Sequence, residues 1–142
     1  MPLSSPLVEI LVGEDNPADS RLISLCLESL EKEVKVTCFP GGRKLKDFLI
    51  ERPDTDMPTC LFLDFFLAEI EGPRLLKWIR EESHFSDLPV IMMSGSYLDE
   101  VREKSYEFGG NYFLEKSTDP ERFFMEIIGI VEYLISLRSR ED

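Results

Sequence analysis

The sequence contains little cysteine and almost no histidine. Its 142 residues include three cysteines, Cys26, Cys38 and Cys60, with no CxxC spacing among them. An odd number of cysteines this far apart is poor material for a disulfide framework, so we expect three buried thiols in a reducing, cytoplasmic compartment. The single histidine, His84, is expected at the end of a helix and not as a ligand.

Positive charge and long apolar runs are also scarce. The chain has 16 Lys and Arg against 28 Asp and Glu, a formal net charge of −12, and shows no basic cluster. Such a charge repels nucleic-acid phosphates and anionic membrane surfaces, so neither is expected as a partner. No uncharged apolar stretch approaches the roughly 18 residues of a membrane span, and the N-terminus lacks the positive region of a signal peptide.

Apolar residues are nevertheless plentiful, at 43% hydrophobic and 11% aromatic. That is enough for the core of one domain. The hydrophobic periodicity switches repeatedly between patterns typical of strands and of helices. It predicts strands at 7–12, 34–39, 60–67, 89–93 and 112–114, and helices from Pro17 to about Lys32, around Leu45–Leu49, after Pro73, between Tyr97 and Phe108, and from Pro120 nearly to the C-terminus.

This strict alternation of strands and helices predicts a single α/β domain. Right-handed crossovers then place helices on both faces of a parallel, doubly wound (βα)5 sheet. The common five-stranded solution has the strand order 2-1-3-4-5 and gathers ligands at the carboxyl ends of its strands. We expect this domain at residues 7–137, with a flexible N-terminus at 1–6 and a charged tail at 138–142.

Polar side chains lie at the ends of four predicted strands. Glu14 and Asp15 follow the first strand, Asp64 lies near the end of the third, Ser94 ends the fourth, and Lys116 follows the fifth. In the predicted order these strand ends are adjacent, so three carboxylates converge with a hydroxyl and an ammonium. Three neighbouring negative charges need neutralisation, and hard oxygen ligands with an incomplete shell suit Mg²⁺. Lysine adds a compact positive charge suited to phosphate.

Each of these residues alone has a simpler structural explanation. Glu14 and Asp15 could be the acidic first turn of a helix, and Ser94 an ordinary loop residue. Asp64 could be an ion-pair partner of Lys116, although a carboxylate inside an apolar strand is costly to leave unpaired. Their occurrence together at one sheet edge favours a functional site.

The same residues resemble the receiver domain of two-component response regulators, the CheY-like family, along nearly the whole chain. The resemblance implies a flavodoxin/CheY-like fold and a phosphoryl group that Asp64 accepts from a histidine kinase. It implies no enzymatic activity beyond the protein's own phosphorylation and slow dephosphorylation. Without an output domain, signalling is expected through protein contacts. The matching segments are Glu14-Asp15-Asn16, Asp64, Ser94-Gly95 and Phe113-Leu114-Glu115-Lys116.

The resemblance also implies a set of metal ligands. Glu14 and Asp15 would hold Mg²⁺ together with Asp64 and the backbone carbonyl of Phe66. Mg²⁺ is therefore the expected cofactor.

Further roles follow from the resemblance for the residues around the phosphoryl group. Ser94 and Lys116 would contact its oxygens, and Ser94 and Phe113 occupy the switch positions. Phe66 and Ser96 would flank the mouth of the pocket. Because a phenyl ring can neither orient a water nor accept its proton, Phe66 implies a long phosphoryl lifetime.

Three positions depart from the family pattern. Ala68 and Ser117 stand where prolines are typical, the second one with a cis peptide bond, and Phe66 is large and apolar. A cis bond before a residue other than proline costs about 2.5–4 kcal/mol, so we expect a trans Lys116–Ser117 bond with the Lys116 ammonium still reaching the pocket. The segment 16–22 is similar to small receivers that serve phytochrome-type kinases.

Several partners and functions remain open. The expected partner is a sensor histidine kinase, with the phytochrome type as one candidate, or a histidine phosphotransfer protein. The apolar last helix could support a homodimer, although a helix docked on its own sheet shows the same stripe. One alternative is a phosphorylation-independent pseudo-receiver, which would normally have lost the acidic pair, the aspartate or the lysine. A small Mg²⁺-dependent aspartyl-phosphate phosphatase needs an acid where Phe66 stands, and a flavodoxin-type loop would not begin with Glu14 and Asp15.

Overall fold

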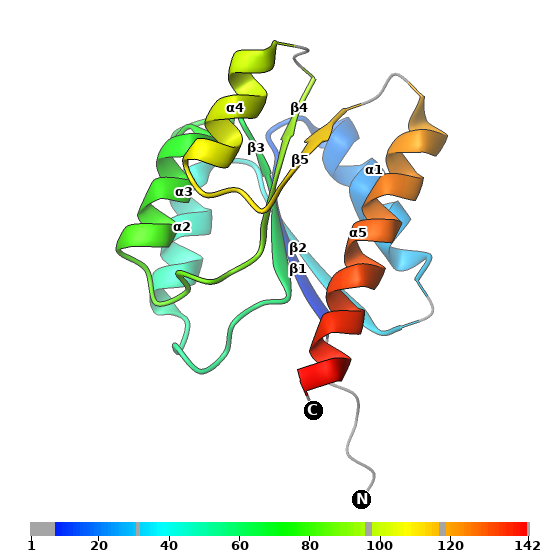
Figure 1. The fold of residues 1–142 in the computed structure, drawn as a ribbon, viewed down its shortest axis with the longest axis horizontal. Helices are drawn as coiled ribbons and strands as arrows, with labels where there is room; N and C mark the ends of the chain where they lie inside the picture. Colours follow the sequence, from blue (N-terminus) through cyan, green and yellow to red (C-terminus); the bar gives the residue numbers. More distant parts are fainter. Residues whose placement is uncertain (1–7, 31, 96–97, 117–118, 142) are drawn as a thin grey trace, which may run out of the picture.

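The computed structural model describes residues 8–30, 32–95, 98–116 and 119–141, which form five strands and five helices in strict alternation (Figure 1). The strands are β1 (Val8–Gly13), β2 (Val34–Phe39), β3 (Cys60–Asp64), β4 (Val90–Ser94) and β5 (Tyr112–Glu115), and the helices are α1 (Pro17–Glu28), α2 (Gly42–Glu51), α3 (Gly72–Glu81), α4 (Asp99–Glu107) and α5 (Pro120–Glu141).

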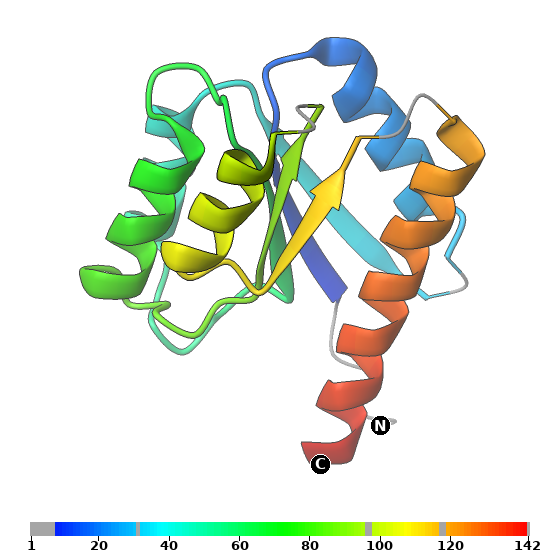
Figure 2. The same ribbon diagram turned by 45° about the horizontal axis from the view of Figure 1, so that its top comes forward.

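The strands form one parallel sheet between two layers of helices. Its order is β2-β1-β3-β4-β5, which confirms the predicted topology. Helices α1 and α5 cover one face, and α2, α3 and α4 cover the other (Figures 1 and 2). The carboxyl ends of all strands therefore lie at one edge, where the candidate site residues are found.

Two hydrophobic cores explain why the central strands are almost continuously apolar. Leu61 and Leu63 of β3 belong to the core beneath α2, α3 and α4, whereas Cys60 and Phe62 belong to the core beneath α1 and α5. Successive side chains of a strand point to opposite faces, and here both faces are covered. The apolar pattern of β3 thus reflects burial on both sides.

The strand predicted at 60–67 is too long, because β3 ends at Asp64. The Asp64 side chain itself turns the chain, since its Oδ1 accepts the Phe66 N–H at 3.3 Å. Phe65 and Leu67 remain buried although they lie in the following loop. The apolar run continues past the strand because this loop packs into the core.

The ends of two helices and the exposure of one cysteine differ from what the sequence predicts. The first helix ends at Glu28 and not near Lys32. Helix α5 continues through residues 138–141, where the sequence predicts a charged tail. The prediction of three buried thiols is wrong for Cys38, which is exposed on the edge strand β2. Within the described residues, no helix is long and apolar enough to cross a membrane.

Candidate functional site

The register of the sheet brings the predicted carboxylates together. Gly13 of β1 is paired with Leu63 of β3, so the next residues, Glu14 and Asp64, leave neighbouring strands side by side. The carboxylate oxygens of Glu14, Asp15 and Asp64 lie within 4.8 Å of one another. Glu14 and Asp64 are buried, whereas Asp15 is exposed. One edge of the sheet therefore presents three acids to a single small volume.

Lys116 reaches this volume from the end of β5. Its backbone N–H donates to the Ser94 carbonyl at 2.8 Å, which continues the β4–β5 ladder by one residue. Its Nζ forms ion pairs with Glu14 Oε1, with Asp19 Oδ2 at 3.1 Å and with Asp64 Oδ2 at 3.4 Å. The expectation that the Lys116 ammonium reaches the pocket agrees with this geometry. Ser117, and with it the predicted trans bond, lies outside the described residues.

The charges of the pocket do not balance. Burial raises the pKa of Glu14 to about 7 although Lys116 lowers it, and the nearby Asp64 carboxylate adds to the rise. Burial alone would lower the pKa of Lys116, but close contact with the Glu14 carboxylate and the charge of Asp64 outweigh it and raise that pKa. One ammonium thus faces more negative charge than it can neutralise.

The donor set fits a hard divalent cation. Glu14 Oε1 is buried and makes no hydrogen bond of acceptable geometry; among the described residues it meets Lys116 as an ion pair. Carboxylate oxygens at this spacing, with Asp15 open to water, suit Mg²⁺, which retains several waters. Glu14, Asp15 and Asp64 are the residues that would hold the ion.

The remaining predicted site residues lie around this cluster. Ser94 is the last residue of β4 and is buried at the same edge. Phe66 is 56% exposed beside the acids and packs edge-on against Phe65, with ring centroids 4.8 Å apart. Phe113 of β5 is half-buried against the core beneath α2, α3 and α4. Ser96 lies outside the described residues.

Asp19 is the site residue that the sequence analysis missed. It lies in the first turn of α1, where Asn16 Oδ1 accepts the N–H groups of Ala18 at 2.9 Å and of Asp19 at 3.3 Å. Its carboxylate pairs with Lys116. The available signal was an acidic residue in the first turn of a predicted helix, directly after the Asn16 cap.

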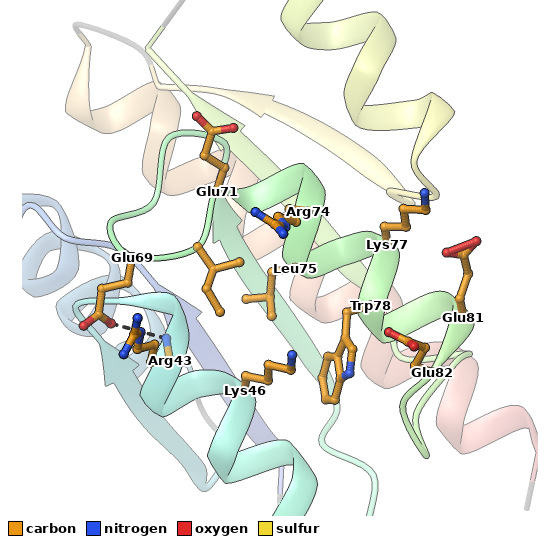
Figure 3. A pocket seen from close by; sticks show the side chains of 11 residues that line it. Arg43, Lys46, Glu69, Glu71, Arg74, Leu75, Lys77, Trp78, Glu81 and Glu82 are labelled. Atoms are coloured by element: carbon orange, nitrogen blue, oxygen red, sulfur yellow. Dashed lines mark hydrogen bonds between the residues drawn. The ribbon is translucent and has the colours of Figure 1, made fainter.

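The loop that follows Asp64 is fixed to two helices. A Cβ at Gly72 would overlap the Asp64 carbonyl oxygen, so the start of α3 approaches the end of β3 as only glycine allows. The Ala68 carbonyl, at a position where the family has proline, accepts the Gly42 N–H at 2.9 Å. Glu69, with an uncommon φ of 71°, accepts the Arg43 N–H at 3.3 Å (Figure 3).

A groove between α2 and α3 is separate from the acidic cluster. It has a volume of about 710 Å³ and contains Lys46, whose Nζ lies 5.0 Å from the centre of the Trp78 ring (Figure 3). None of its lining residues belongs to the carboxylate cluster. His84 also lies away from the acids, in the segment after α3, against the Phe85 ring. Among the described residues, the carboxylate cluster thus lies at the carboxyl edge of the sheet, apart from this groove.

Comparison with known proteins gives consistent results. The family model described as "Response regulator receiver domain" matches residues 10–128. The chain is 26% identical to response regulator Rcp1 of Synechocystis sp. over 133 residues, which cover 92% of this chain and 90% of Rcp1. The phosphorylated cyanobacterial phytochrome response regulator RcpA is similar in structure, with a TM-score of 0.82, 26% identity, and coverage of 91% of this chain and 94% of RcpA. The Mn²⁺-bound form of Rcp1 gives a TM-score of 0.79 at 25% identity, covering 89% and 94%.

Proposed function

Because the chain belongs to the response regulator receiver-domain family, we propose that Asp64 accepts a phosphoryl group from a histidine kinase in a Mg²⁺-dependent reaction. The observation that carries this proposal is the position of the Asp64 carboxylate, buried between two further acids and the Lys116 ammonium. If Asp64 served only as an ion-pair partner of Lys116, two further acids beside it would not be needed.

The step is an in-line phosphoryl transfer. An Asp64 carboxylate oxygen attacks the phosphorus of a phosphohistidine, a P–O bond forms, the P–N bond breaks, and the electron pair stays on the imidazole nitrogen, which takes up a proton. Lys116 and Ser94 bind the oxygens of the transferred group. A bound Mg²⁺ supplies positive charge that reduces repulsion between those oxygens and the carboxylates. The protein then signals through contacts with other proteins.

We further propose a phytochrome-type sensor kinase as the phosphodonor, or a histidine phosphotransfer protein in a relay. RcpA is a phytochrome response regulator by name, and its likeness covers most of both chains. Segment 16–22 contributes the Asn16 cap and the Asp19 carboxylate beside the acceptor. A phosphodonor that approaches Asp64 would contact this first turn of α1, beside the carboxylate cluster.

A second copy of this chain is the proposed occupant of the outer face of α5. Met125 and Tyr133 of this helix are 71% and 63% exposed, and with Tyr112 of β5 they line an apolar groove of about 450 Å³. Light scattering during gel filtration should give a dimer mass that Tyr133→Glu converts to a monomer mass. A wild-type protein that stays monomeric at every concentration would contradict the dimer and leave phosphoryl transfer unaffected.

Intact-mass measurement after incubation with acetyl phosphate tests the proposed reaction. We expect a gain of about 80 Da, the mass of one phosphoryl group, that requires Mg²⁺ and is abolished in Asp64→Asn. Asp47→Asn, an exposed acid on α2, is the matched control and should gain the same mass. Absence of the gain in wild type would favour the pseudo-receiver alternative. Release of phosphate with rapid turnover would favour the phosphatase.

A further inference from the structure

We propose that Asp19 is a positioning residue that holds Lys116 in the unphosphorylated protein and releases it when a phosphoryl group occupies Asp64. The inference rests on the proposed function, because it concerns the lysine expected to bind that group. It begins with a contact between α1 and the end of β5 that the predicted roles leave unexplained.

In the unphosphorylated pocket, Lys116 already faces as many carboxylates as it has N–H groups. An ammonium has three N–H groups, and the Lys116 Nζ faces three carboxylates: Glu14, Asp19 at 3.1 Å and Asp64 at 3.4 Å. A phosphoryl group on Asp64 adds acceptor oxygens and replaces a carboxylate of charge −1 by an acyl phosphate of about −1.5 to −2. For Lys116 to bind them, one of its present contacts must be given up.

Burial decides which contact is released. The Glu14 side chain is 0% exposed and would be left without its ammonium in the protein interior, which is costly. Asp64 itself carries the incoming group. The Asp19 side chain is 33% exposed, so water can replace Lys116 around it. Loss of the contact with Lys116 therefore costs less free energy at Asp19 than at Glu14.

Asp19 is also held in place independently of Lys116. Its backbone N–H donates to the Asn16 cap, and Pro17 begins the helix. The carboxylate thus stays at the rim of the pocket when Lys116 leaves it. Removal of the Asp19 charge should weaken its ion pair with Lys116 before phosphorylation and should therefore favour the phosphorylated state.

The first test is a double-mutant cycle on unfolding in urea without phosphodonor. The variants are Asp19→Asn, Lys116→Ala and both together. Asp19→Asn should lower the folding equilibrium constant when Lys116 is present. This loss should be about three- to fivefold larger than the loss in the Lys116→Ala background, which is the coupling expected of a partly exposed ion pair. Absence of this coupling would overturn the proposal, since Asp19 would then not hold Lys116.

The second test is the affinity of the folded protein for beryllofluoride, a phosphoryl mimic, in the presence of Mg²⁺. Asp19→Asn should bind it about three- to fivefold more tightly than wild type, and Asp19→Glu should restore the wild-type affinity. Asp99→Asn, which removes an acid from the first turn of α4 without touching Lys116, should leave the affinity unchanged.

Unchanged or weaker beryllofluoride binding in Asp19→Asn would overturn the proposal that Asp19 releases Lys116. Failure of the proposed function looks different. In that case the wild-type protein neither binds beryllofluoride nor gains mass from acetyl phosphate, whereas the Asp19–Lys116 coupling in unfolding is still measured.

Discussion

At the scale of single residues, unequal burial determines what each carboxylate of the pocket can do. Glu14 is fully buried and meets Lys116, so its charge is costly without a cation. Asp15 is exposed and open to a hydrated ion, while Asp64 is buried beside the same ammonium. This difference is why we propose Asp64 as the acceptor: it lies between the exposed Asp15 and the Lys116 ammonium.

The Phe66 side chain should slow loss of the phosphoryl group. It follows Asp64 by two residues, is half-exposed, and offers no group that could orient an attacking water. We expect Phe66→Asn to shorten the phosphoryl half-life about 10- to 100-fold, at about 1.4 kcal/mol of barrier for each tenfold. Ile50→Asn, on α2, is the matched exposed control. If Phe66→Asn loses the group no faster than wild type, packing explains the size of Phe66.

The three thiols should differ sharply in reactivity. Burial raises the pKa of Cys26 to about 11 and that of Cys60 to about 12, whereas Cys38 is exposed. Because the thiolate is the reactive form, Ellman's reagent should modify one thiol quickly in the native protein and all three after denaturation. Cys38→Ser should abolish the fast phase. Rapid reaction of a second thiol would show that the core beneath α1 and α5, which contains both Cys26 and Cys60, opens.

At the scale of elements, the site depends on the junction between β3 and α3. The strand ends where Asp64 Oδ1 accepts the Phe66 N–H, and the loop is tied to α2 by the Ala68 carbonyl. The Gly72 N–H donates to the Phe65 carbonyl at 3.0 Å and closes the loop against β3. These contacts fix the backbone that follows Asp64.

Gly72→Ala should therefore damage both stability and the site. The added methyl group would overlap the Asp64 carbonyl oxygen, and overpacking of this kind costs about 1–3 kcal/mol of unfolding free energy. Urea denaturation measures the loss. Gly129→Ala in α5 is the matched control, because nothing lies within 4 Å of its Cβ position and alanine should stabilise a helix by up to about 1 kcal/mol. Equal effects of the two substitutions would refute the close approach at Gly72.

At the scale of the whole molecule, alternation and periodicity were sufficient to predict the topology. The five strands, their order and the convergence of Glu14, Asp15, Asp64 and Lys116 follow from local patterns and from the geometry of parallel sheets. Their roles in phosphoryl transfer remain predictions.

Other features depend on contacts between segments far apart in the sequence. The exposure of Cys38 follows from the edge position of β2, which an alternating pattern does not reveal. The partnership of Asp19 with Lys116 joins residues 97 positions apart. Glu9 lies within the apolar strand β1, yet it is buried and paired with Arg52 at the end of α2. Neither the exposure of Cys38 nor these two ion pairs produces a periodic pattern in the sequence.

Mg²⁺ should stabilise the folded molecule as a whole. A ligand that binds only the native state raises the free energy of unfolding, by about 2.7 kcal/mol at a hundredfold excess over Kd. We expect a higher thermal midpoint with Mg²⁺, a response largely lost in Asp15→Asn, and a wild-type response in Asp47→Asn. An identical response of all three proteins would place the ion elsewhere.

The most direct test of the account is to locate the phosphoryl group. After incubation with acetyl phosphate and Mg²⁺, borohydride reduces an aspartyl phosphate to homoserine, and peptide sequencing by mass spectrometry then identifies the modified position. We predict homoserine at position 64 alone, with none when Mg²⁺ is removed. Modification at Glu14, Asp15 or Asp19 in place of Asp64, or no modification at all, would contradict the assignment of Asp64 as the acceptor.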